Sequence, residues 1–101
     1  MAQQRDDLEV VSEADLTVDD TARRFPISAI IANGRLARKV EIFFEDAQCR
    51  VRRDGTDPTS TVGDIYNPFD RTTLMSLIQA WRFRAIRTGS TNATAHYKVL
   101  A

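Results

Sequence analysis

The sequence predicts an all-β fold: a single small β-sandwich or jelly-roll-like barrel of about seven or eight strands. Three observations lead to this prediction. Short segments alternate apolar and polar residues, these segments are rich in β-branched and aromatic side chains, and Gly, Pro, Asn and Asp separate them about every 8–12 residues. At 101 residues and 43% hydrophobic side chains, the chain has the length and composition of one globular domain with a modest core.

Charge is distributed unevenly along the chain, although the formal net charge is zero. Residues 1–20 contain seven acids and one base, whereas residues 21–101 contain 13 bases and seven acids. We expect residues 1–13 to be an extended or disordered acidic arm and residues 14–101 to form the β domain. The arm is either a solvated tail or a segment that docks on a basic surface of its own domain or of a neighbouring subunit.

The first half of the domain contains four segments that alternate in this way. We expect strands at residues 16–18, 25–31, 39–45 and 48–53. Asn33-Gly34 is a strong two-residue turn signal and predicts a hairpin. Within the third segment, Val40, Ile42 and Phe44 share one face, which we expect to be buried.

The second half predicts a short strand at residues 65–66 and longer ones at 83–87 and 93–100. Residues 70–82 admit two interpretations. Asp70 could cap a helix that carries an apolar face, or a strand at 72–75 could be followed by one helical turn at 77–81. We favour the strand and turn, because the segment is too short for a large helix if Phe83 begins the next strand.

Two segments, residues 50–63 and 83–94, each run from an Arg-containing strand into a turn rich in Gly, Thr and Ser. We interpret the first turn as structural, with glycines at left-handed positions, a rigid proline and side chains that hydrogen-bond the loop backbone. The residues of this turn motif are Asp54, Gly55, Thr56, Pro58, Thr59 and Gly63. We further expect Arg84 and Arg87 to tie this loop to the next hairpin.

The composition disfavours an enzyme. His96 is the only histidine and lies in an alternating segment, which is typical of a surface or interface residue rather than of a general base. Cys49 is the single cysteine and is expected in the core. No ligand spacing, phosphate loop or dinucleotide motif is present, so we predict no catalytic residue, no cofactor and no metal site.

The cellular context is predicted from two further features. The N-terminus is polar, and no apolar run reaches the roughly 18–20 residues of a membrane span. We therefore expect a cytoplasmically made protein with no membrane partner. Nucleic-acid binding through an arginine stripe with stacking by Trp81, Phe83 and Tyr97 is a weaker alternative, because net charge is zero and aromatic residues are only 8%.

The segments at residues 50–63 and 83–94 resemble a pattern in small phage-encoded, virion-associated β-sandwich proteins of the head decoration or cement type. Asn67, Pro68 and Asp70 match the continuation of that pattern, and the resemblance covers about half of the chain, within residues 37–100. It implies a virion structural protein, made in the host cytoplasm, that coats the capsid surface, binds the major capsid protein and forms a dimer or trimer.

With this resemblance, the uneven charge indicates two candidate interfaces, namely the acidic arm and an Arg-rich sheet face. Their residues are Asp6, Asp7, Glu9, Arg50, Arg52, Arg84 and Arg87. Two other functions remain open at this point: a head–tail connector, tail or host-recognition component of the virion, and a stand-alone module that binds glycan or nucleic acid.

Overall fold

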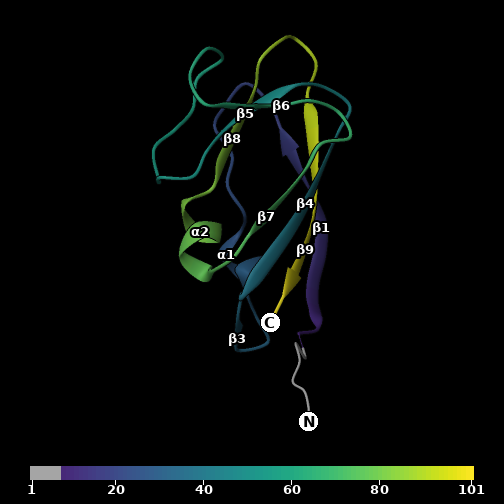
Figure 1. Ribbon diagram of the computed structural model, residues 1–101, viewed down its shortest axis with the longest axis vertical. Helices are drawn as coiled ribbons and strands as arrows, with labels where there is room; N and C mark the ends of the chain where they lie inside the picture. Colours follow the sequence, from purple (N-terminus) through teal and green to yellow (C-terminus); the bar gives the residue numbers. More distant parts are fainter. Residues whose placement is uncertain (1–7) are drawn as a thin grey trace.

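A computed structural model describes residues 8–101 of the chain. Two antiparallel sheets form most of the molecule (Figure 1). One sheet has the strand order β1-β9-β4-β7, the other has the order β6-β5-β8, and β2 and β3 form a separate hairpin. The strands are β1 (Val10–Val18), β2 (Ile31–Ala32), β3 (Arg35–Leu36), β4 (Lys39–Glu45), β5 (Cys49–Arg52), β6 (Asp64–Tyr66), β7 (Arg71–Leu74), β8 (Arg84–Arg87) and β9 (Ala93–Leu100). Two short helices, α1 (Ile27–Ile30) and α2 (Leu77–Arg82), lie beside each other in the lower half of Figure 1, above the β2–β3 hairpin. The all-β fold class is confirmed.

The two sheets share one hydrophobic core. Val40, Ile42 and Phe44 of β4 are buried, as the alternation predicted, and alternate residues of β9 are buried beside them. The ring of Phe44 stacks on Tyr66 of the other sheet, with centroids 4.5 Å apart. Phe25 stacks on Phe83 at 4.7 Å and thereby joins the segment before α1 to the same core.

The first strand is longer than predicted. β1 begins at Val10 and pairs with β9 from Val10↔Leu100 to Val18↔Ala93, so residues 10–13 of the predicted arm belong to the sheet. Sequence alternation missed this part because β1 is an edge strand on which only Val18 is buried. An edge strand can carry charged side chains along its length without leaving the sheet.

The predicted strand at residues 25–31 is wrong. Ile27–Ile30 forms the helical turn α1, and Ala29 and Ile30 donate backbone hydrogen bonds to the carbonyl of Pro26. Pro26 is the N-cap of this turn, with extended backbone at φ −60° and ψ 143°, and its carbonyl accepts the first hydrogen bonds of the turn. The alternation of this segment therefore reflected helical burial of Phe25, Ala29 and Ile30.

The other local predictions agree with the structure. Asn33 and Gly34 have φ of 54° and 74° and connect β2 to β3, as expected for a two-residue hairpin turn. Residues 70–82 form strand β7 followed by the short helix α2, which is the favoured interpretation. Ser76 caps α2 by accepting a hydrogen bond from the Gln79 amide at 3.2 Å, whereas Asp70 accepts from the Asn67 amide at 2.7 Å.

Candidate interaction surfaces

The loop between β5 and β6 is held by its own side chains. The carboxylate of Asp54 accepts hydrogen bonds from the amide of Thr56 at 3.0 Å and from its hydroxyl at 2.5 Å. The hydroxyl of Thr59 accepts from the Val62 amide at 3.0 Å. Pro58, which belongs to the same loop, is buried.

Two glycines of this loop adopt left-handed backbone, with φ of 87° at Gly55 and 129° at Gly63. A Cβ at Gly63 would lie 3.1 Å from the Val51 carbonyl oxygen and 3.3 Å from the Arg50 Cβ. Only glycine therefore fits at position 63, where the chain passes close to β5.

Three of the predicted interface arginines share the outward face of the three-stranded sheet, and each is engaged within the chain. Arg50 donates to the carbonyl of Ser60 at 3.1 Å and to that of Gly63 at 2.8 Å. Its neighbours on β5 and β8 are Arg52 and Arg84, which lie opposite each other in the register.

Both of these arginines are also engaged within the chain. Arg52 donates to the Asp54 carboxylate at 2.7 Å. Arg84 donates to the carbonyls of Trp81 and Phe83, and its Nε lies 3.6 Å from Asp57. This arginine face holds the loop at residues 53–63 in place.

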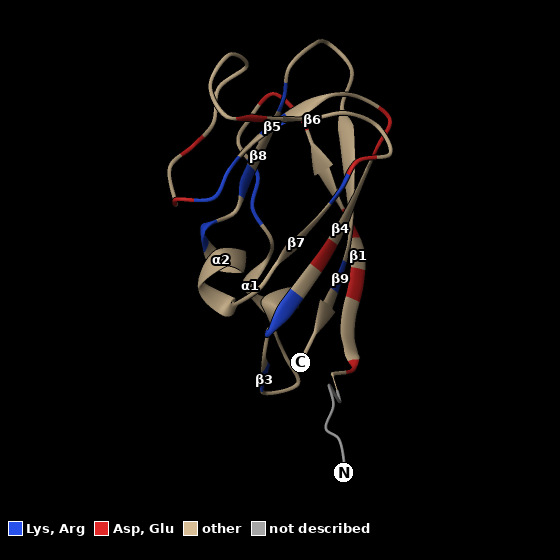
Figure 2. Cartoon of the chain, in the orientation of Figure 1, with Lys and Arg blue, Asp and Glu red and all other residues tan. Residues whose placement is uncertain are grey.

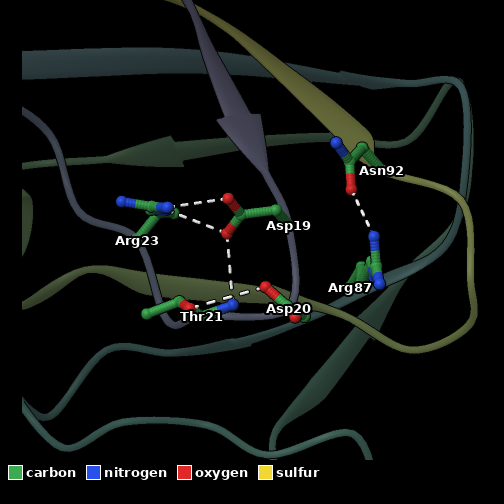
Figure 3. A network of polar contacts seen from close by, with 6 residues as sticks. All are labelled: Asp19, Asp20, Thr21, Arg23, Arg87 and Asn92. Carbon is green, nitrogen blue, oxygen red and sulfur yellow. Dashed lines mark hydrogen bonds and ion pairs between the residues drawn. The ribbon is translucent and has the colours of Figure 1, made fainter.

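Arg87 lies apart from this face. In the register it pairs with buried Cys49, so it belongs to the other side of the sheet. Its guanidinium donates to the Asn92 side chain at 2.6 Å, within the hairpin that joins β8 to β9 (Figure 3). Of the predicted pair, Arg84 lies within ion-pair distance of Asp57 in the 53–63 loop, whereas the hydrogen bond of Arg87 stays within its own hairpin.

The described acids of the first twenty residues are largely paired within the chain. Glu9 binds Arg35 at 2.9 Å, and its backbone pairs with that of Ala101. Asp19 accepts two hydrogen bonds from the guanidinium of Arg23, at 2.9 and 2.7 Å (Figure 3). This pair lowers the pKa of Asp19 to about 2. The predicted interface residues Asp6 and Asp7 lie outside the described residues.

His96 connects β9 to β1 on the outer face of the four-stranded sheet. Its Nδ1 lies 2.6 Å from Asp15 and its Nε2 lies 2.8 Å from Glu13. These hydrogen bonds raise the pKa of His96 above its ordinary value, because both carboxylates favour the imidazolium form. Because its two ring nitrogens each bond a carboxylate of β1, His96 links β9 to β1; we call this arrangement the His96 clamp.

The same outer face is hollowed between β1 and β7. Phe43 of β4 lines this hollow, level with His96 and Arg71 in the strand register, and the guanidinium of Arg71 lies over its ring, 4.6 Å from the centroid. The hollow is lined by Glu13, Glu41, Ile42, Phe43, Arg71, Thr72, Thr73, His96 and Lys98. A lining with one aromatic ring and charges of both signs suits a polypeptide segment with both apolar and charged side chains.

Large apolar side chains are exposed on α1, α2, the β2–β3 hairpin and the residue that follows β7. We call this surface the helix-end patch. The patch consists of Ile27, Ile31, Leu36, Met75, Ile78 and Trp81. Arg24 lies 5.5 Å from the Trp81 ring centroid. Within residues 8–101, Arg24, Arg38 and Arg82 form no ion pair with a carboxylate.

The opposite end of β4 forms what we call the acidic tip, which consists of Glu45, Asp46, Phe69 and Asp70 (Figure 2). Phe69 is 77% exposed, the most exposed large apolar side chain of the described residues. Its φ of 75° is unusual for an aromatic residue, and its ring lies 6.2 Å from that of Phe43. In the described part of the chain, the three carboxylates have no ion-pair partner.

Several sequence-based alternatives can be placed on this structure. Cys49 is buried, and burial raises its pKa to about 12. Phe83 and Tyr97, considered for nucleic-acid stacking, are buried in the core. Among residues 8–101, no group of three or more His, Cys, Asp and Glu side chains is placed to hold a metal ion.

Comparison with known proteins finds no family model, no curated protein and no solved structure that matches the chain. Neither helix in the described part of the chain is long and apolar enough to cross a membrane. Sequence reasoning missed both the helix-end patch and the acidic tip, because their residues come from separate segments. The Phe69 backbone angle gave no sequence signal, since Asn67-Pro68 only indicated a break.

Proposed function

We propose that this chain is a structural protein of a bacteriophage particle, a capsid cement or decoration protein that binds the head shell and stabilises it. The likeness of residues 50–63 and 83–94 to virion-associated β proteins supports this proposal. The observation that carries it is the hollow on the outer face of the four-stranded sheet, which Phe43 lines with the guanidinium of Arg71 over its ring.

This hollow is the surface that we assign to the shell. It lies on a regular four-stranded sheet, so its side chains are held by strand register rather than by a loop. A preformed surface of this kind loses little conformational entropy when it binds. A segment of the major capsid protein would place an apolar side chain against Phe43 and a carboxylate near Arg71 or Lys98.

The arginine face contributes differently from the sequence-based expectation. Arg50, Arg52 and Arg84 already have partners in the chain, so binding the shell through them would first break those contacts. We therefore assign these arginines to the stability of the 53–63 loop. Of the predicted acidic arm, Glu9 is paired with Arg35 and residues 10–13 belong to β1, so Asp6 and Asp7 are the acids that stay a proposed second contact.

The test is the copy number of the protein in purified virions, measured by mass spectrometry against the major capsid protein. A capsid cement is expected in copies comparable to the number of capsid subunits or of their local symmetry sites. A copy number matching a single portal or tail would move the protein to the connector or tail, and absence from the particle would refute the proposal.

A binding assay with isolated shells locates the contact. Phe43→Ser is expected to weaken binding to shells. Thr91→Asn, in the exposed loop between β8 and β9 and outside the lining of the hollow, is expected to leave binding unchanged. Equal binding by the two variants would rule out the outer sheet face as the shell contact.

A further inference from the structure

We propose that copies of this chain associate with each other by docking the acidic tip of one copy onto the helix-end patch of another. This inference uses only contacts and charges of the described residues, and it does not depend on the proposed function.

The two surfaces carry charges of opposite sign. At the acidic tip, Glu45, Asp46 and Asp70 form no ion pair within residues 8–101, and around the helix-end patch the same holds for Arg24, Arg38 and Arg82. Asp64, Arg71 and Lys98 on the strands also form no ion pair in the described residues, but they carry mixed signs and belong to different strands. Three acids at the tip and three arginines around the patch are thus two groups of opposite sign without an ion pair in that part of the chain.

The two surfaces lie at opposite ends of β4. Glu45 ends β4, and the backbone of Phe69 donates to the carbonyl of Phe44, so the tip lies at the end of this strand. Lys39 begins β4, and Met75 directly follows β7, the neighbour of β4, at the patch. Because the surfaces lie at opposite ends of the same strands, a tip cannot reach the patch of its own chain (Figure 1).

The apolar groups of the two surfaces differ in form. Phe69 projects from a turn with 77% of its surface exposed and with a left-handed backbone. Such a backbone costs about 1–3 kcal/mol for a residue other than glycine and is often found at binding sites. On the patch, the exposed side chains of Trp81, Met75 and Ile78 can receive this ring. Aromatic residues and methionine are enriched at protein interfaces.

The sign of the charges selects this arrangement over the alternatives. Two patches facing each other would bring their arginines together, and two tips would bring their carboxylates together, so both arrangements are opposed by like-charge repulsion. Docking tip to patch pairs the opposite charges and covers Phe69 at the same time. Depending on the rotation between copies, this contact closes a dimer or ring, or continues as a chain.

The experiment measures self-association of the purified full chain by sedimentation velocity over a range of protein concentrations at low salt. Phe69→Asn removes the aromatic ring and retains a residue that tolerates left-handed backbone. Ile78→Gln removes an exposed side chain of the patch and retains helix propensity. Each variant is expected to weaken self-association about tenfold or more, and thermal unfolding should show that both remain folded.

Mixing the two variants gives the decisive result. Phe69→Asn retains an intact patch, and Ile78→Gln retains an intact tip, so the mixture should form heterodimers although each variant alone remains largely monomeric. Thr91→Asn serves as the matched surface control and should associate like the wild type.

Three outcomes would overturn the inference. The wild type could remain monomeric at every concentration, or Phe69→Asn could associate as strongly as the wild type, which would indicate contact between two patches. Flotation of a monomeric wild type with anionic phospholipid vesicles, abolished by Ile78→Gln, would instead make the patch a lipid-binding surface.

Discussion

The molecule has two sets of arginines that look alike in the sequence and differ in the structure. On the three-stranded sheet, Arg50 and Arg52 bind the carbonyls and the carboxylate of the adjacent loop. Around the helix-end patch, Arg38 and Arg82 have no carboxylate partner in the described residues. The difference shows that the pairing of an arginine, rather than its abundance in a segment, distinguishes a residue that stabilises the fold from one available for binding.

The largest effect on stability is expected from Gly63→Ala, which disturbs the loop that the arginines of the three-stranded sheet hold. Gly63→Ala places a Cβ 3.1 Å from the Val51 carbonyl oxygen in a backbone with φ of 129°. The carbonyl of Gly63 must then move away from Arg50, and we expect a loss of about 2–4 kcal/mol in the free energy of unfolding. Chemical denaturation measures this loss.

Gly89→Ala is the matched control, because a Cβ there meets no atom within 4 Å and the backbone is not left-handed. We expect a change within about 0.5 kcal/mol for this variant. Equal losses at both glycines would show that the close approach at Gly63 contributes nothing specific.

A smaller effect is expected at the pair formed by Asp19 and Arg23. The pair lowers the pKa of Asp19 to about 2, so its stabilising contribution is fully present above pH 4 and is lost as pH falls towards 2. Asp19→Asn should remove part of the acid sensitivity between these values, measured as the midpoint of thermal unfolding. Asp20→Asn changes the neighbouring acid, which has no ion pair in the described chain, and should preserve that sensitivity.

The smallest effect is expected at His96, because Glu13 and Asp15 are well exposed to solvent. The pKa of His96 is raised, so its contribution is fully present below about pH 6.5 and is lost as pH rises through the higher folded value. Wild-type stability should therefore decline slightly over that window, by about 1 kcal/mol or less. His96→Gln should flatten the decline, and an unchanged slope would show that the clamp does not contribute.

Alternation along the strands predicted the parts of the fold that bury one face. Residues 39–45 and 93–100 were identified because Val40, Phe44 and Val99 recur on the buried side of β4 and β9. The boundaries of β1 and the helical turn at 27–30 were not, because an edge strand buries little and because the alternating segment buries Ala29 and Ile30 through a helical turn.

The candidate surfaces were less accessible to sequence reasoning. The turn residues Asp54 and Gly63 could be identified because their chemistry is local. The partners of Arg50 and His96 could not, since each depends on register between segments that are distant in the chain. A patch formed by six residues from several elements has no local pattern at all.

The most direct test compares the two sets of arginines in one pair of variants. Unfolding free energy and self-association are measured for Arg50→Ala and for the double variant Arg38→Ala/Arg82→Ala. Arg50→Ala should lose about 1–2 kcal/mol of stability, because two hydrogen bonds to loop carbonyls disappear, and should associate normally once folded. The double variant should retain wild-type stability and associate weakly. If both variants lost stability, or if only Arg50→Ala weakened association, the distinction between paired and available arginines would be contradicted.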